Sequence, residues 1–375
     1  MSLLQQRHWT PLRIALCAGF GTLGIGFLAV PTATAQSAAA TAPATGSASE
    51  FDSPSGLAFN GGDLWVSNLD GNSVTEINPT SGAWVDTYND SSYQFNQPTA
   101  ITSSGADLFV ANAGGSVTEL QASNGALVRV ISGSQYDFAD PVAIDAVGST
   151  IIVLSAGEPS ATPAVPASIT EIDAATGDLV VTNSKANLAL DDPVALTAIN
   201  GDVFVPDEGN NSVTEASVAT DKLVRVITNP GLGAPDGIAS GDGHVWAVDS
   251  GPSGVTEIDS ATGTVLNTWT DNNGSYGFAS PSVAIEPNGA VFIASPFGSS
   301  PMITKVGKNG AAKWYMCNTN GPYYFSLPSA FAVSGKDLWV ASSSGANNPN
   351  QDAATGSLTE MLTSTGALVT TLPQS

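Results

Sequence analysis

The chain has 375 residues, with 33 acidic side chains against 10 basic ones and a formal net charge of −23. Nucleic acids and anionic membrane surfaces are bound mainly through Lys and Arg, so this charge argues against both as partners. Charged residues make up only 11% of the chain while there are 39 glycines, a balance typical of short strands joined by many turns.

The first 35 residues have the pattern of a signal peptide. Two arginines precede an apolar run at 14–30, and Ala33-Thr34-Ala35 supplies the small-x-small motif of a cleavage site. An uncleaved anchor is the alternative, since an apolar run of 17 residues approaches the lower limit for spanning a bilayer. Residues 36–50, rich in Ala, Ser and Thr, predict a flexible tether. We therefore expect a secreted or cell-surface protein with no membrane insertion once the signal is cleaved.

From residue 51 onward the chain is a tandem repeat. A large residue at the centre of each DLWV-like segment recurs at spacings of 42 to 52 residues, and a proline about eleven residues earlier recurs in step with it. The central residues are Trp65, Phe109, Ile152, Phe204, Trp246, Phe292 and Trp339, and the prolines are Pro54, Pro98, Pro141, Pro193, Pro235, Pro281 and Pro328. Seven units of this length are typical of propeller blades rather than of helical repeats.

Each unit contains four short β-prone runs separated by turn residues, as in residues 98–131, and none contains a helix-length stretch of 3.6-residue periodicity. The sequence thus predicts an all-β fold, a seven-bladed β-propeller of four-stranded antiparallel blades over residues 51–375. The blades start near the seven prolines. The DLWV-like strand should be buried between neighbouring blades. The last strand, 367–372, closes its own blade, so no strand from the N-terminus should complete it.

Two segments carry a family resemblance. LWVSNLDGNSVTEINPTSG at 64–82 and LFVANAGGSVTELQASNG at 108–125 resemble the YVTN-type repeat of exported bacterial propellers, and Pro-x-Gly-Leu-Ala at 54–58 resembles the NHL repeat. The same segments are similar to the virginiamycin B lyase family, whose fold is also a seven-bladed propeller. That family's chemistry relies on histidine near the axis of the variable rim. His244, the one histidine after the signal, falls in a predicted turn on the opposite rim, where we expect it to be exposed.

The third strand of six units carries a Thr-Glu pair. A ring of glutamates suggests a metal, but calcium needs six to eight oxygens within about 2.6 Å, and one Glu per blade on the outer half of the ring cannot supply them. We expect these glutamates to be structural, either exposed or hydrogen-bonded. They are Glu76, Glu119, Glu171, Glu215, Glu257 and Glu360.

The loops differ between the two rims of the predicted ring. Turns between the third and fourth strands are short and end in Gly, which indicates a structural rim. The opposite rim carries insertions at 157–168 and 342–357 and recurring Tyr-x-Phe elements. Aromatic residues there could bind an extracellular protein, peptide or glycan, or each Tyr and Phe could fill the gap between blades, with the Phe more buried than the Tyr. The binding candidates are Tyr93, Tyr136, Tyr276, Tyr323 and Tyr324.

The favoured function is a non-catalytic binding or scaffold module without a cofactor. The alternative is a metal-dependent hydrolase or lactonase, because the lactonases on a related six-bladed propeller hold a divalent cation with Glu, Asn and Asp at the axis. Asn and Asp at such turns more often bond their own backbone. The candidate ligands, where the second strand ends, are Asn68, Asn112, Asp207, Glu208 and Asp249.

Overall fold

The computed structural model describes residues 51–184, 188, 190–251, 254–270, 282–285, 289–295, 302–307, 312–317, 327–343 and 356–372. All of them belong to the second of two units into which the chain divides, Pro43–Ser375. The predicted signal peptide and tether lie outside the described residues. Within the described ranges, no helix is long and apolar enough to cross a membrane.

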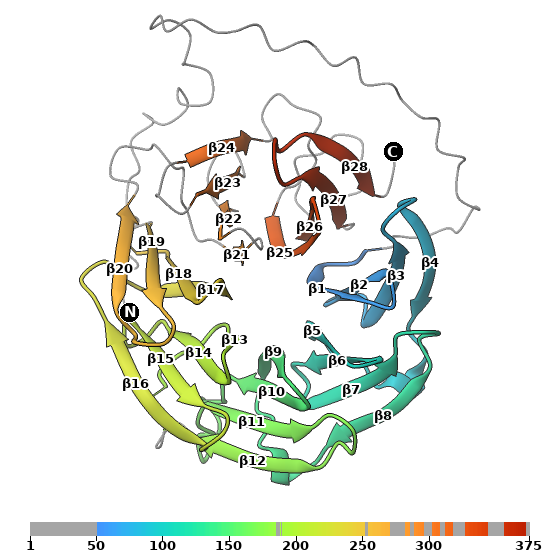
Figure 1. Cartoon of the computed structure of the whole chain (residues 1–375). Helices are drawn as coiled ribbons and strands as arrows, with labels where there is room; N and C mark the ends of the chain where they lie inside the picture. The colour runs from blue at the N-terminus through green and yellow to red at the C-terminus, as the bar shows by residue number, and fades with distance from the viewer. Residues whose placement is uncertain are drawn as a thin grey trace, which may run out of the picture. The chain divides into compact units, whose positions relative to one another are not determined.

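The strands form seven four-stranded antiparallel sheets, each built from consecutive strands (Figure 1). The first four sheets contain β1 (Pro54–Asn60), β2 (Asp63–Asn68), β3 (Ser73–Asn78) and β4 (Ala83–Tyr88); β5 (Pro98–Ser104), β6 (Asp107–Asn112), β7 (Ser116–Gln121) and β8 (Leu127–Ser132); β9 (Pro141–Val147), β10 (Thr150–Ser155), β11 (Ser168–Asp173) and β12 (Leu179–Ser184); and β13 (Thr197–Ile199), β14 (Asp202–Asp207), β15 (Ser212–Ser217) and β16 (Lys222–Thr228). The other three contain β17 (Pro235–Gly241), β18 (His244–Asp249), β19 (Gly254–Asp259) and β20 (Val265–Thr270); β21 (Ser282–Ile285), β22 (Val291–Ser295), β23 (Met302–Val306) and β24 (Ala312–Cys317); and β25 (Leu327–Ser334), β26 (Asp337–Ser343), β27 (Ser357–Leu362) and β28 (Leu368–Leu372). Two short 3-10 turns, η1 (Ser91–Tyr93) and η2 (Ser134–Tyr136), follow β4 and β8.

The innermost strands of the sheets contact one another in chain order, from β1 through β5, β9, β13, β17 and β21 to β25, and β25 contacts β1 (Figure 1). The predicted all-β propeller of four-stranded antiparallel blades is therefore confirmed. Among the described residues, the last sheet consists of β25 to β28, as predicted, and it packs against the first sheet to close the ring.

The central residue of each DLWV-like strand is buried between sheets, as predicted. All seven side chains are at most 1% exposed. Phe109 packs against Ile144 and Ile151 of the next sheet, and Trp339 packs against Val66 of the first sheet. Apolar burial of this kind is the main favourable term in folding. The repeated large residue therefore stabilises each contact between blades, including the one that closes the ring.

Three of the marker prolines, Pro54, Pro98 and Pro141, have a second role in joining neighbouring sheets. Pro lacks an N–H and suits the start of a strand, but its carbonyl still accepts. The Ser55 hydroxyl donates to the Pro98 carbonyl at 2.6 Å and the Thr99 hydroxyl to the Pro141 carbonyl at 2.8 Å. The Ser329 hydroxyl donates to the Pro54 carbonyl. In these three places, the hydroxyl one residue after a marker proline donates to the carbonyl of the marker proline in the next sheet. One of the three bonds joins the last sheet to the first.

The repeated glutamates are buried, so the exposed alternative is wrong; two of them accept a side-chain hydrogen bond and two others lie in ion pairs. Three of them interact with the residue directly opposite on the outermost strand, whereas Glu76 stands opposite Asp86 and bonds a residue two positions further along. Glu119 lies 2.9 Å from Arg129, whose Nη2 donates to the Ala175 carbonyl in a turn of the next sheet. Glu215 and Arg225 repeat the ion pair at 3.0 Å. Glu76 accepts from the Tyr88 hydroxyl, and Glu257 accepts from Asn267.

The prediction that His244 is exposed in a turn is wrong. It begins β18, and its Nδ1 lies 2.9 Å from an oxygen of Glu257, with about a third of the side chain exposed. The cause is register, because His244 pairs directly with Asp259 on the neighbouring strand, two residues from Glu257 and therefore on the same face of that strand. The histidine therefore belongs to the pairing of β18 with β19.

Candidate functional site

In each of the first five sheets, the loop that follows the second strand is bonded to the loop that leads into the first strand. The Gly114 N–H, in the β6–β7 loop, donates to the Asn96 carbonyl in the loop that leads into β5, at 3.1 Å. The Gly157 N–H, after β10, donates in the same way to the Ala139 carbonyl at 2.9 Å. The two kinds of loop therefore share one rim, as predicted from the alternating strand directions.

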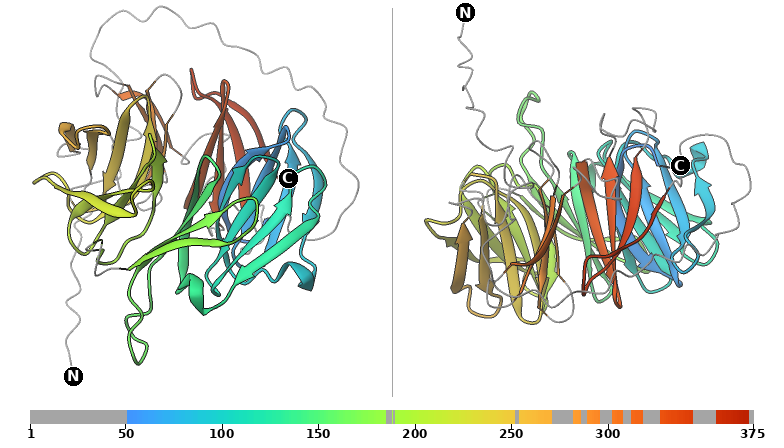
Figure 2. Two further views of the ribbon diagram at one scale, coloured as in Figure 1. Left: turned by 60° about the horizontal axis from the view of Figure 1, so that its bottom comes forward. Right: turned by 90° about the horizontal axis from the view of Figure 1, so that it is seen from above.

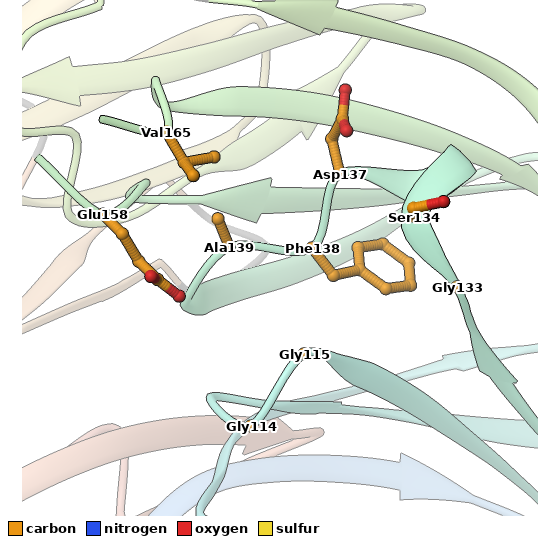
Figure 3. A pocket seen from close by; sticks show the side chains of 9 residues that line it. All are labelled: Gly114, Gly115, Gly133, Ser134, Asp137, Phe138, Ala139, Glu158 and Val165. Carbon is orange, nitrogen blue, oxygen red and sulfur yellow. The ribbon is translucent and has the colours of Figure 1, made fainter. Parts of the chain in front are cut away.

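A hollow of about 330 Å³ opens on this rim between the second and third sheets (Figure 3). Its walls come from the β6–β7 loop, from the loop that follows η2, and from the insertion between β10 and β11. The lining residues are Gly114, Gly115, Gly133, Ser134, Asp137, Phe138, Ala139, Glu158 and Val165. Its volume lies at the lower end of the range for small-molecule sites.

The insertion after β10 has a fixed neck. Glu158 and Val165 exchange two backbone hydrogen bonds, at 2.8 and 3.1 Å, and the six residues 159–164 extend beyond this pair. Figure 2 shows the green segment as a projecting hairpin. Gly157 has φ +84°, and a Cβ there would lie 2.6 Å from the Val165 carbonyl oxygen, so glycine is required at the neck. The wall that carries Glu158 is thus held in place before any ligand arrives.

The Tyr136–Phe138 pair closes the gap between the second and third sheets. The Tyr136 hydroxyl donates to the Gly177 carbonyl at 2.8 Å, and its ring stacks on Phe138 with centroids 5.2 Å apart. Tyr136 is 8% exposed whereas Phe138 is half-buried, so the prediction that the Phe is more buried than the Tyr is wrong here. The hydroxyl's carbonyl partner allows the Tyr to be buried. Phe138, rather than Tyr136, lines the hollow.

Tyr93 occupies the equivalent place between the first two sheets. Its hydroxyl donates to the Gly125 carbonyl at 2.8 Å and its ring stacks on Phe95 at 5.4 Å. Tyr93 and Phe95 are both half-buried against the core that joins these sheets. The other candidates, Tyr276, Tyr323 and Tyr324, lie outside the described residues.

Four of the predicted metal ligands hold loops instead of facing one another. Asn68, Asn112, Asp207 and Asp249 each end the second strand of a different sheet and are fully buried. Asp207 accepts the Asp191 N–H at 2.8 Å, Asp249 accepts the Gly233 N–H at 3.1 Å, and Asn112 bonds Thr118 at 3.1 Å. In the ranges given above, no three His, Cys, Asp or Glu residues lie close enough to hold a metal.

Asp236 is an acid that sequence reasoning missed. It follows the marker proline at the start of β17, where other sheets carry Ser55 or Thr99. Its Oδ1 is buried, and no described residue bonds it. Burial, then the charge of Glu208, raises the pKa of Asp236 to about 7, and burial likewise raises that of Asp249, with Asp236 adding to the effect. The sequence signal for this acid was a carboxylate at the position after the marker proline, where other repeats carry a hydroxyl.

No protein-family model matches the chain, and no curated protein matches it. Among solved structures, the computationally designed protein Ika8 is similar over 86% of this chain and 87% of its own, at 14% identity and a TM-score of 0.59. Virginiamycin B lyase from Staphylococcus aureus is similar over 78% of this chain and 92% of its own, at 13% identity and a TM-score of 0.62. At these identities the likeness shows the propeller fold alone.

Proposed function

We propose that the chain is an exported, non-catalytic binding or scaffold propeller of seven blades, one for each sheet, with repeats of the YVTN/NHL type. The signal-like N-terminus supports export, and the excess of acidic residues suits a soluble extracytoplasmic domain. The partner is an extracellular protein, peptide or glycan that docks on the loop rim. No cofactor takes part.

The hollow between the second and third sheets is the observation that carries this proposal. Three separate loops converge there, an aromatic ring is exposed in part, and a projecting hairpin forms one wall (Figure 3). On the opposite rim, the turns at 79–82, 122–125 and 174–177 are short and nearly identical in length. Binding sites concentrate on variable loops held by a rigid scaffold, and this rim has both properties.

Shortening the hairpin tests the proposal. Residues 159–164 are replaced by Asn-Gly, a two-residue turn that preserves the Glu158–Val165 pair at the neck. Labelled wild-type and shortened proteins are then applied to arrays of oligosaccharides and of immobilised twelve-residue peptides. We expect the wild-type protein to bind a defined subset, and the shortened protein to lose that binding by tenfold or more while its melting temperature stays within a few degrees.

A change on the opposite rim is the matched control. Ala175→Ser with Thr176→Asn converts the 174–177 turn into the sequence found at 122–125. This variant should bind as the wild type does. Equal binding by all three proteins, or loss caused by the control, would remove the support for a site on the loop rim.

A metal-dependent hydrolase remains the second candidate, and Asp236 is the observation that favours it. Its Oδ1 is buried without a hydrogen bond from any described residue, the charge of Glu208 helps to raise its pKa, and its own charge helps to raise that of Asp249. Buried carboxyls with a pKa near 7 are common where acids act in catalysis. Addition of divalent ions to the protein, described in the Discussion, tests this alternative directly.

A further inference from the structure

We infer that the hollow between the second and third sheets takes an ammonium or guanidinium group, the side chain of a Lys or Arg on an extended partner polypeptide. The inference rests on the proposed binding function and names the chemistry of its ligand. Two side chains carry it, the half-buried ring of Phe138 and the exposed carboxylate of Glu158.

Phe138 offers a fixed aromatic surface. One face of its ring stacks on Tyr136 at an interplanar angle of 16°, and Tyr136 is itself tied to the Gly177 carbonyl. Phe138 is only half-buried, lines the hollow, and lies across it from Gly115 (Figure 3). Cations bind the faces of aromatic rings, and a ring that is already ordered loses little entropy on binding.

Glu158 supplies the charge. Its backbone is held by Val165, and its side chain reaches toward the same side of the hollow as the ring of Phe138, whereas Asp137 points away (Figure 3). None of the nine lining residues is basic. Partial burial, then the charge of Glu158, raises the pKa of Asp140 beside it, so these two carboxylates repel each other. A ligand cation would relieve that repulsion.

The wall formed by the β6–β7 loop leaves space for a side chain that enters from outside. Gly114 and Gly115 have no side chains to fill the hollow, and a Cβ on Gly115 would lie 3.0 Å from the Phe138 carbonyl oxygen. The hollow is open to solvent rather than enclosed, which suits one side chain of a macromolecule better than a small molecule buried on all sides. The net charge of −23 also draws a basic partner toward the protein.

The test uses peptides that differ in one group. A nine-residue Gly/Ser peptide with a central Arg is compared with the same peptide carrying citrulline, which keeps the shape of the side chain but has no charge. Dissociation constants are measured by calorimetry for residues 36–375 at low and high salt. We expect the Arg peptide to bind more tightly than the citrulline peptide and to weaken as salt rises.

Three variants locate the interaction. Glu158→Gln and Phe138→Leu should each weaken the Arg peptide about two- to fivefold, as expected for one exposed ion pair or one cation–π contact. Asp178→Asn, on the turn of the opposite rim in the third sheet, removes the same charge elsewhere and should leave binding unchanged. Equal weakening by Glu158→Gln and Asp178→Asn would show general attraction to an acidic protein and overturn the inference.

Other outcomes separate this inference from the proposed function. If array ligands bind through the hairpin but replacing Arg by citrulline in them changes nothing, the cation is wrong and the binding module stands. If free arginine amide binds as tightly as the peptide, the partner is a small amine rather than a polypeptide. If neither the arrays nor the Arg peptide binds, both proposals fail.

Discussion

Glu171 permits a test of how the repeated glutamates are accommodated. It lies on β11, is 3% exposed, and stands directly opposite Val181, which offers neither charge nor hydrogen bond. Burial, with a smaller contribution from the charge of Asp221, raises the pKa of Glu171 from 4.5 to about 7. Glu215, at the same place in the next sheet, faces Arg225 instead.

The direction of the pH dependence follows from comparing the pKa of Glu171 in the folded and unfolded protein. A carboxyl whose pKa is higher in the folded protein binds its proton more tightly there. Its contribution is therefore fully present below the unfolded value of 4.5 and is lost as the pH rises through about 7. One pKa unit corresponds to about 1.4 kcal/mol, so a rise from 4.5 to about 7 limits the loss for Glu171 at pH 8 to about 3.5 kcal/mol, and water penetration will reduce it.

Glu171→Gln removes the ionisable group and keeps its shape. We expect the variant to be more stable than the wild type by about 1–3 kcal/mol at pH 8 and by less than about 1 kcal/mol at pH 5. Urea unfolding at the two pH values measures this difference. Glu215→Gln is the comparison. Burial raises the pKa of Glu215 to about 7 as well, although Arg225 opposes the shift, so this variant should also gain stability from pH 5 to pH 8, by less than Glu171→Gln at each pH because it loses the ion pair with Arg225. A gain in Glu171→Gln that does not depend on pH, or a larger gain in Glu215→Gln, would refute this reasoning.

Three further predictions concern the ring and the ions. Trp65→Ala should lower the free energy of unfolding by about 3–5 kcal/mol, because it empties a buried site between the first two sheets; a loss below about 1 kcal/mol in urea unfolding would contradict this packing. Ser329→Ala should cost about 1 kcal/mol, similar to Ser55→Ala, since both remove a hydroxyl bonded to the next sheet; thermal unfolding compares them, and no loss in Ser329→Ala alone would mean that the closing bond contributes nothing. After EDTA treatment, adding Ca²⁺, Mg²⁺, Mn²⁺ or Zn²⁺ should not shift the melting temperature. An ion that binds the folded protein and is present at a hundred times its dissociation constant raises the free energy of unfolding by about 2.7 kcal/mol. A shift in melting temperature that Asp236→Asn abolishes would therefore favour the hydrolase.

The sequence predicted the fold because the same pattern of strands and turns occurs in seven successive repeats. Large central residues and marker prolines recur in step, and each has a local physical reason in the structure: burial between sheets for Trp65 or Phe109, and a carbonyl available to the preceding sheet for Pro54 or Pro98. Alternating strand directions then placed the loops on the correct rims. Features that recur in every repeat can be recognised in a single sequence, because the repeats can be compared with one another.

The candidate site was harder to predict because it depends on features that occur once. The burial of Tyr136 requires knowledge that its hydroxyl reaches Gly177, about forty residues along the chain. The hollow needs the neck formed by Glu158 and Val165 and the glycines beside it. His244 was misplaced by the boundary of a strand, the part of an element that sequence patterns define least well. Asp236 replaces the hydroxyl that Ser55 and Thr99 supply, and a single replacement in one repeat does not reveal that its carboxyl is buried.

Hydrogen–deuterium exchange with a ligand selected on the arrays tests the location of the site most directly. The account predicts that bound ligand slows exchange in three segments, 113–115, 133–139 and 157–168, which lie far apart in the sequence and meet at the hollow. The turns at 122–125 and 174–177 on the opposite rim should exchange as in the free protein. Protection confined to those turns, or to the outermost strands, would contradict a binding site on the loop rim.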